Sequence, residues 1–307
     1  MSLRINNNVE ALNAHRHLLN NEKMLTKSLE RLSSAQKINR GADGPAALVI
    51  SEGMRSQIAS LHQAADNNES AISLVQTAEG ALNEVSKLLR DMRQRAVAAA
   101  NIGLNDENMV NASQQEIENA LDTIDRISTN TQFGSKNLLD GNGKAAVEVP
   151  EAAAEAASTG KDSKSLAFQI GANRGQMVSI DLPSVATTEL AKGVSNQSAF
   201  ASLADVDVTT GQGAQDAMAV IDTAIEEIAV ARGEMGAFQK NTLESNLTSL
   251  RIHTENLTAA ESSIRDADMA VELAAFTRNQ IMTQSATAQL AQANAMPKNV
   301  MALLASQ

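Results

Sequence analysis

The amino-acid sequence predicts a mainly α-helical protein, built as a long antiparallel helical bundle or coiled coil with a small β-hairpin region. Aromatic residues make up only 2% of the 307-residue chain, with five Phe and no Trp or Tyr, so Ala, Leu, Ile and Met must supply the packing. Long stretches contain few Gly or Pro residues. Within these stretches apolar residues recur every three or four positions, which is the spacing of a helix that buries one face.

Composition excludes several classes of function. The net charge of −11 and the pI near 4.9 disfavour nucleic acid as a partner, because nucleic-acid binding depends on clustered Lys and Arg. The chain has no Cys, which removes disulfides and thiolate sites. The sequence has no stretch of about 18 apolar residues, so we expect no membrane span. The N-terminal residues lack the apolar core of a signal peptide, so we expect either a cytoplasmic protein or export without a cleaved signal.

A helix is predicted from Val9 to about Ile38. Leu18, Leu25 and Leu32 recur every seven residues with Leu29 on the same side, which is the spacing of a coiled-coil seam. The pattern stops at the run from Gly41 to Pro45, where two glycines and a proline interrupt the helix. We therefore assign residues 1–44 to the N-terminal part of an inner coiled-coil domain.

A core rod domain is expected from residue 45 onwards, and residues 45–143 form its N-terminal part. Its first helix runs from about Ala46 to Ala100, and its seam contains an interruption that we interpret as a stammer. The first part of this seam is Ile58, Leu61, Ala65, Asn68, Ile72 and Val75, and the second is Ala78, Leu82, Val85, Leu89, Met92, Ala96 and Ala99. A shorter helix, ending near Ser128, should fold back antiparallel to it.

The composition changes between Thr131 and about Val185, where Gly, Asn, Ser and Asp become frequent. Two alternating segments, Leu166–Ile170 and Met177–Leu182, flank a glycine-containing turn, so we predict a β-hairpin. Residues 144–165 contain almost no large apolar side chain and are assigned to a short variable loop. Residues 166–265 then form the C-terminal part of the rod domain.

Two further seams follow on a long helix that begins beyond Gly213. The first contains Met218, Ile221, Ile225, Ile228 and Met235, and the second contains Leu243, Leu247, Leu250, Leu257 and Ile264. From the two rod helices we select as core-domain seam residues Ile58, Leu61, Ile72, Val75, Leu82, Leu89, Leu243, Leu247, Leu250, Leu257 and Ile264.

The last part of the chain, residues 266–307, is assigned to the C-terminal part of the inner coiled coil. Met269, Leu273 and Phe276 are interpreted as one apolar face, which continues through polar residues before it reaches Leu290. Because a helix with so thin an apolar stripe is marginal alone, we interpret both terminal helices as assembly elements. The residues expected to pack between subunits are Leu18, Leu25, Leu29, Leu32, Met269, Leu273, Phe276 and Leu290.

The candidate catalytic, cofactor and metal sites are weak. His15 and His17 lie two positions apart and so do not share a helix face. Gly171 to Gly175 lacks the Gly-Lys-Ser/Thr of a phosphate-binding loop. The carboxylate pairs Glu226-Glu227 and Asp266-Asp268 are interpreted as solvated charge on helices. We therefore expect no enzyme activity, no cofactor and no metal.

Several runs, in order along nearly the whole chain, resemble the bacterial flagellin family. The N-terminal runs are Leu3–Asn8, Arg31–Ser34, Ile38-Asn39, Gly41–Ser51 and Val75–Leu82. The later runs are Phe133, Leu138–Gly141, Gln169–Asn173, and Ser263–Asn294, which includes Arg265–Ala270 and Leu290–Asn294.

The resemblance implies a subunit that self-polymerises into a flagellar filament and serves swimming motility. It implies a coiled coil made from both termini, export in unfolded form through the flagellar secretion apparatus, and a secreted, extracellular location. The implied partners are other copies of the chain, a cytoplasmic export chaperone on residues 266–307, and the flagellar cap and hook-junction proteins. The short variable loop implies a form with almost no outer domain.

The resemblance also implies a surface for the innate immune receptor that senses flagellin, on residues 89–101. Flagellins that activate this receptor carry Arg-x-Arg-Glu-Leu there, whereas this chain has Asp91, Arg93, Gln94 and Arg95 at the corresponding positions. Only Arg93 is kept, together with Glu116 on the neighbouring helix. Because one charge is reversed and one apolar anchor is lost, we expect weak recognition or none.

Two alternatives remain at this point. A hook–filament junction protein shares the terminal design but is present in few copies. A secreted hydrolase with an unrecognised site belongs to a different class, and no residue cluster favours it.

Overall fold

The structure is a computed structural model that describes residues 8–101, 103, 105–141, 164–195 and 197–305. The chain forms two compact units, which we describe separately. The terminal unit comprises Met1–Ile58 and Glu255–Gln307, and the rod unit comprises Ala59–Thr254. The divisions expected at residues 44 and 265 both fall inside the terminal unit.

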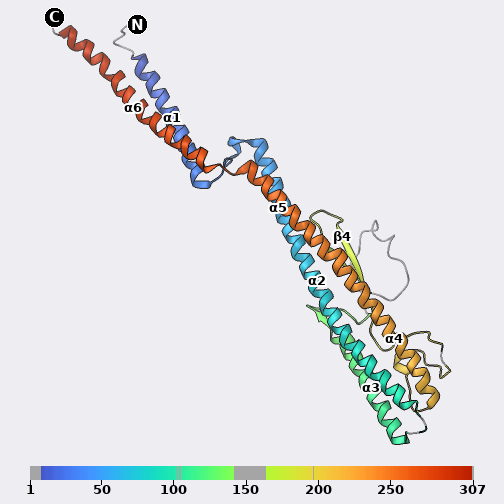
Figure 1. Ribbon diagram of the computed structural model, residues 1–307. Helices are drawn as coiled ribbons and strands as arrows, with labels where there is room; N and C mark the ends of the chain where they lie inside the picture. The colour runs from blue at the N-terminus through green and yellow to red at the C-terminus, as the bar shows by residue number, and fades with distance from the viewer. Residues whose placement is uncertain (1–7, 102, 104, 142–163, 196, 306–307) are drawn as a thin grey trace. The chain divides into compact units, whose positions relative to one another are not determined.

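The terminal unit is built on two long helices, α1 (Val9–Ser34) and α6 (Met269–Ala305), which lie side by side and antiparallel (Figure 1). The unit also contains the short 3-10 helix η1 (Gly41–Asp43), the first turns of α2 (Pro45–Ala99) and the last turns of α5 (Ser245–Arg265). The apolar seam and the absence of interior Gly or Pro before Pro297 account for the two long helices.

Helix α1 ends earlier than predicted, at Ser34 and not near Ile38. Ala35 adopts a left-handed conformation with φ of 56°, which stops the helix. The residues that follow pair with the segment before α6, because Gln36 and Asp266 form an antiparallel bridge. Two backbone hydrogen bonds hold this crossing, from Lys37 N to Arg265 O and from Ala267 N to Ala35 O.

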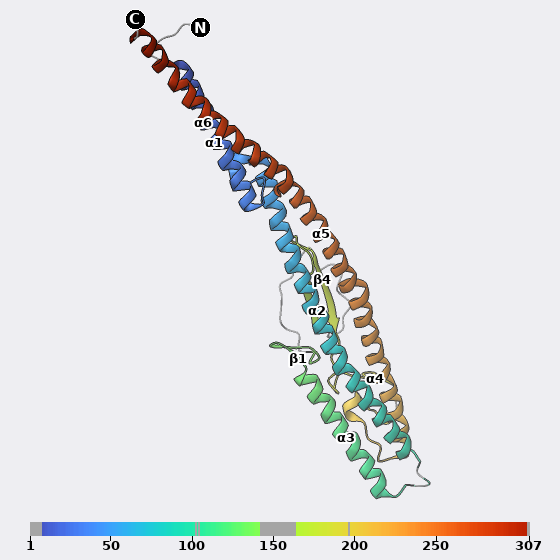
Figure 2. The ribbon, with the colours of Figure 1, turned by 60° about the vertical axis from the view of Figure 1, so that its left-hand side comes forward.

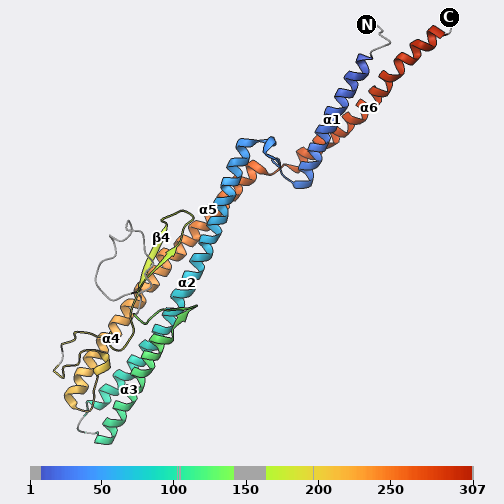
Figure 3. The same cartoon turned by 180° about the vertical axis from the view of Figure 1, so that it is seen from behind.

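The rod unit contains most of α2, together with α3 (Glu107–Asn130), α4 (Gly211–Phe238) and the first part of α5. Helix α3 folds back along the C-terminal part of α2, as predicted (Figure 3). Twelve buried positions of α2 follow an unbroken alternation of three and four, and Ser51 and Leu74 are buried in addition. The twelve are Leu61, Ala64, Asn68, Ala71, Val75, Ala78, Leu82, Val85, Leu89, Met92, Ala96 and Ala99.

The interpretation of a stammer in α2 is therefore wrong. Ala64 and Ala71 occupy the seam, whereas Ala65 and Ile72 lie beside it and are only partly buried. Because Ile72 is large and apolar, the sequence pattern places it in the seam, whereas the structure buries Ala71 there. Small alanines suit the seam because they let a neighbouring backbone approach closely.

The two seams on the last rod helix are joined by a π-helical turn, η4 (Gln239–Glu244), which the sequence analysis did not anticipate. In α4 the seam includes Ile221, Ile228 and Met235, and after the turn it resumes at Leu243 and Leu250. A π turn adds a residue to the helical repeat, so it shifts the register between the two seams without breaking the helix.

The predicted β-hairpin is confirmed. Strands β3 (Lys164–Gln169) and β4 (Met177–Leu182) pair antiparallel, with Gln169 opposite Met177 (Figure 2). A second small hairpin, formed by β1 (Gln132–Phe133) and β2 (Lys136–Asn137), was not predicted. Of the variable loop assigned to residues 144–165, residues 144–163 lie outside the described residues, and the other two belong to β3.

An irregular segment between β4 and α4 completes the core of the rod unit. It carries the short 3-10 helix η3 (Leu203–Asp205) and buries several apolar side chains: Val185, Leu190, Ala191, Leu203, Val206 and Val208. These side chains belong to the same hydrophobic cluster as the seams of α2, α3 and α4.

Candidate assembly surface

The contact between α1 and α6 follows heptad spacing on both helices. On α1 the partly or fully buried positions that keep this spacing are Ala11, Ala14, Leu18, Asn21, Leu25, Ser28 and Leu32, and Glu30, Arg31 and Ser34 are also partly buried. On α6, up to residue 296, the corresponding positions are Glu272, Phe276, Asn279, Thr283, Ala286, Leu290 and Ala293, and Ala275 and Ala295 are also partly buried. Polar and small residues thus occupy most of the positions that a stable two-helix coiled coil fills with large apolar side chains.

Polar side chains of this seam form contacts between the two helices. Nδ2 of Asn279 donates to Oγ of Ser28 at 3.2 Å, and Nδ2 of Asn21 donates to the carbonyl of Met282 at 3.3 Å. Nearer the end of the pair, Nδ2 of Asn8 donates to the carbonyl of Ala293 at 2.8 Å. Such contacts specify how the helices align, but they contribute less stability than apolar packing.

The structure distributes the predicted subunit-packing residues between two surfaces. Leu18, Leu25, Leu32, Phe276 and Leu290 lie in the seam. In contrast, Leu29, Met269 and Leu273 remain 50%, 46% and 56% exposed.

Of the three residues assigned to one apolar face, Phe276 lies in the seam with α1, whereas Met269 and Leu273 lie at its exposed edge. Glu272 and Asn279 occupy the seam positions before and after Phe276. Because both are polar, the spacing of apolar residues does not reveal which positions of α6 form the seam. Of the polar residues assigned to the same face, only Thr283 lies in the seam, whereas Gln280 and Thr287 are exposed.

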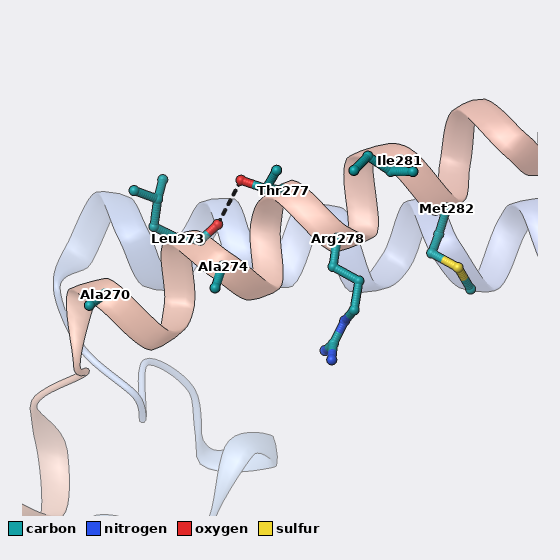
Figure 4. Close-up of a pocket in the computed structure, with 7 residues that line it drawn as sticks. All are labelled: Ala270, Leu273, Ala274, Thr277, Arg278, Ile281 and Met282. Carbon is teal, nitrogen blue, oxygen red and sulfur yellow. Dashed lines mark hydrogen bonds between the residues drawn. The ribbon is translucent and has the colours of Figure 1, made fainter.

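Helix α6 also presents an apolar surface directed away from this seam. A groove open to solvent is lined by Ala270, Leu273, Ala274, Thr277, Arg278, Ile281 and Met282. Figure 4 shows Leu273, Thr277 and Ile281 along one side of the helix. On α1, Leu12 and Leu19 are likewise exposed. We take this exposed apolar row as the candidate assembly surface.

A cluster of polar side chains lies near the Gln36–Asp266 bridge, next to the α1–α6 pair. Nη1 of Arg265 lies 2.8 Å from Oε1 of Glu52, and the fully buried hydroxyl of Ser51 donates to Oε1 of Glu261 at 3.0 Å. Nearby, Nζ of Lys27 lies 2.7 Å from Oδ1 of Asp43. The hydrogen bond from Lys27, together with bonds from backbone amides, lowers the pKa of Asp43 to about 2.

Three of the four carboxylates that were interpreted as solvated charge accept hydrogen bonds. Asp268 accepts hydrogen bonds from the amides of Ala270 and Val271 at the start of α6, and Asp266 accepts one from Ser262. In the rod unit, Oε2 of Glu227 accepts a hydrogen bond from a loop amide at 2.9 Å. Asp266, Asp268 and Glu226 are nevertheless exposed to solvent, as the interpretation expects, whereas Glu227 is partly buried.

The two candidate receptor-contact residues belong to different ion pairs of the rod unit. Nε and Nη2 of Arg93 bind the two carboxylate oxygens of Asp222 at 2.5 and 3.2 Å, which raises the pKa of the guanidinium. Glu116 pairs instead with Arg95. All four side chains are about half exposed, so this surface is accessible to a protein partner.

Within the part of the chain that the structure describes, no group of three or more His, Asp or Glu side chains is placed to bind a metal ion. The described helices also include none with the length and apolarity needed to cross a membrane.

Comparison with known proteins identifies the family. The family model of the bacterial flagellin N-terminal helical region matches residues 5–144, and that of the C-terminal helical region matches residues 218–304. The chain belongs to the bacterial flagellin family. In this flagellin the N-terminal match contains α1, and the C-terminal match contains α6 up to residue 304.

The chain is similar to curated flagellins over almost its whole length. It is 41% identical over 314 residues to the flagellin of Bacillus subtilis, covering 98% of this chain and 100% of the relative. It is 39% identical over 300 residues to the flagellin of Halalkalibacterium halodurans, covering 98% and 99%. A relative from Treponema maltophilum, named flagellar filament 30.7 kDa core protein, is 35% identical over 300 residues, with 98% and 99% covered.

Proposed function

We propose that this chain is a structural subunit that self-polymerises into the bacterial flagellar filament. The observation that carries the proposal is the terminal helix pair, whose seam is mostly polar or small while large apolar side chains such as Leu273 and Ile281 remain exposed. The family membership supports it, and so does the printed name of the Treponema maltophilum relative.

Burial of apolar surface between copies would drive this assembly. Fully burying a Leu or Ile side chain contributes about 1.5 to 3 kcal/mol, so a few exposed residues on each copy suffice for a stable contact. Contacts between different surfaces of successive copies do not close, and they generate an open helical array.

Removal of either terminal segment tests the proposal. Chains lacking residues 1–40 or 266–307 should keep a folded rod unit but should not form filaments, as seen by electron microscopy after heat dissociation and cooling. Normal polymerisation of either truncated chain would contradict the proposal. Filaments formed by the purified full-length chain would also decide against a hook–filament junction protein.

The route to the filament follows from the same assignment. We infer export in unfolded form through the flagellar secretion apparatus to an extracellular location, with a cytoplasmic chaperone bound to residues 266–307 before export. The exposed apolar groove on α6 supports this chaperone contact. Flagellar cap and hook-junction proteins complete the proposed set of partners. Equal binding of the full-length chain and a chain lacking residues 266–307 to a purified export chaperone would contradict this inference.

We further infer weak or absent activation of the innate immune receptor for flagellin. Asp91 and Arg95 stand where activating flagellins have Arg and Leu, and Arg93 is engaged by Asp222. A reporter-cell assay should show potency well below that of an activating flagellin. Comparable potency would contradict the inference.

A further inference from the structure

The irregular segment between β4 and α4 is held by side chains from two helices. We name residues 186–195 and 197–208 the strap. On α3, Asp125 accepts hydrogen bonds from the amide and the hydroxyl of Thr187, both at 2.9 Å. Also on α3, Oε1 of Gln114 accepts from the amide of Val208 at 2.9 Å, while its Nε2 donates to the carbonyl of Val206. Both ends of the strap are thus fastened to α3.

The middle of the strap is fastened to α4 by two carboxylates. Oε2 of Glu227 accepts from the amide of Ala191 at 2.9 Å. Oδ2 of Asp216 accepts from the amides of Gln197 and Ser198 at 3.1 and 2.8 Å, and from the Ser198 hydroxyl at 2.6 Å. Hydrogen bonds to charged acceptors are about twice as strong as those between neutral groups.

The backbone is strained at these two carboxylate anchors. Ala191 and Ala199 adopt φ of 57° and 56°, and outside the strap only Ala35 among the described non-glycine residues has a positive φ. Alanine rarely adopts this left-handed conformation, because its Cβ crowds the backbone. Each strained residue either donates its own amide to a helix carboxylate or directly follows one that does. The anchors therefore hold the strap in a conformation that its own residues disfavour.

The parts of the strap are also bonded to one another. Leu203 N donates to Leu190 O at 3.1 Å, and Ala204 N donates to Thr187 O at 3.2 Å. Leu190, Leu203 and Val206 are buried in the same hydrophobic cluster. Release of one anchor therefore disturbs the backbone bonds and the packing at the others.

We propose that the strap is a cooperative unit, which detaches from the folded rod unit and reattaches to it as a whole. It joins α3 to α4 only when helix side chains bind its backbone amides. Asp216 and Glu227 are its positioning residues, because they hold the strained turns. Local units of this kind open at a lower free energy than the unfolding of the whole domain.

Hydrogen exchange of the full-length chain, followed by NMR, tests the proposal with E227A. The matched control is E226A, because Glu226 is the exposed neighbour on the same helix. We expect E227A to accelerate exchange by about tenfold at the Ala191 amide, and by a similar factor at the Thr187 and Val208 amides, which α3 holds. Exchange at Leu82 in α2 should not change, and E226A should resemble the original protein.

Four outcomes would overturn the proposal. These are no acceleration in E227A, acceleration confined to the neighbourhood of Ala191, equal acceleration at Leu82, or the same behaviour in E226A. A second pair of variants examines the strain itself. A199G should slow exchange of the strap roughly two- to fivefold, because glycine accepts the left-handed conformation. A201G, at an exposed strap residue outside that conformation, should not slow it, and equal effects of the two substitutions would also overturn the proposal.

Discussion

Nδ2 of Asn279 lies 3.2 Å from Oγ of Ser28, which places a hydrogen bond between two polar side chains inside the seam of α1 and α6. Ser28 is buried and Asn279 is partly buried, so the hydroxyl of Ser28 has exchanged water for the Asn279 amide. A polar pair at this depth specifies the alignment of two helices while it lowers the stability that an apolar pair would supply. The pair thus accounts for a seam that is well defined but weak.

The Ser28 and Asn279 pair predicts a non-additive double mutant. S28A alone leaves the Asn279 amide without its partner and should destabilise the filament by about 1 kcal/mol per subunit. Adding N279L removes the unpaired group, so the double variant should recover this loss or exceed it. The measurement is the melting temperature of assembled filaments, with Q280L at an exposed position as the control for added apolar surface. Simple additivity of S28A and N279L would contradict the role of the pair.

We predict that a substitution at Leu273 weakens assembly without affecting folding of the rod unit. Leu273 is 56% exposed on α6, so L273D should leave thermal unfolding of the rod unit unchanged. If neighbouring copies bury this side chain, the same substitution costs about 1.5 to 3 kcal/mol per contact and should strongly reduce polymerisation. Sedimentation of filaments measures the effect, and Q280D adds the same charge at an exposed polar position. Undiminished polymerisation of L273D would show that this face stays in water.

We predict that the β-hairpin is held in place by the buried side-chain amide of Asn68. Its Nδ2 donates to the carbonyl of Ala64 at 2.8 Å and to that of Ile170 at 3.3 Å, next to a 2.7 Å bond from Asn246 to the same Ile170 carbonyl. N68A should destabilise the rod unit by about 1 to 3 kcal/mol, because it removes these two bonds and the 3.4 Å bond that Asn68 accepts from Asn246, all at a fully buried residue.

Urea unfolding provides the measurement for N68A, and the exposed residue Asn119 provides the control. N119A should change the free energy of unfolding by less than about 0.5 kcal/mol. Faster hydrogen exchange in β3 and β4 should accompany the loss in N68A. An effect no larger than that of N119A would show that Asn68 does not hold the hairpin.

Asp43 predicts a loss of stability in acid. Its pKa in the folded state, about 2, lies below its ordinary value of 3.8, so the carboxylate stabilises the terminal unit above about pH 4. This contribution is lost as the pH falls from about 4 to about 2. Because the hydrogen bond from Lys27 is the largest cause, K27M should move the pKa of Asp43 back towards 3.8.

Solid-state NMR of the Asp43 carboxyl carbon in assembled filaments measures this titration. K23M, which removes an exposed lysine from the same helix, is the control and should leave the titration of Asp43 unchanged. Titration of the original protein near pH 3.8 would contradict the assigned role of Lys27.

The periodic parts of the fold were predictable from the sequence, because they follow one physical rule. Leu82, Leu89 and Ile117 recur at helical spacing and are buried where that spacing places them. The hairpin was predictable because alternating apolar residues flank a glycine-containing turn. In both cases large apolar side chains outline the buried face.

Prediction failed where small or polar residues occupy the buried face. Ala64 and Ala71 are less apolar than Ile72, so the predicted seam of α2 was shifted. The polar residues Glu272 and Asn279 concealed the seam of α6. The strap was not predicted because its conformation depends on Asp125, Asp216 and Glu227, which lie in other elements. The sequence of residues 186–208 alone contains no pattern from which those contacts could be predicted.

The central claim is that α1 and α6 become stable through neighbouring copies, and hydrogen exchange tests it most directly when dilute monomer and assembled filament are compared. We expect amides of Val9–Ser34 and Met269–Ala305 to exchange rapidly in the monomer and to be strongly protected in the filament. Amides of the α2 seam around Leu82 should be protected in both forms. Equal protection of α1 and α6 in the dilute monomer would contradict the claim.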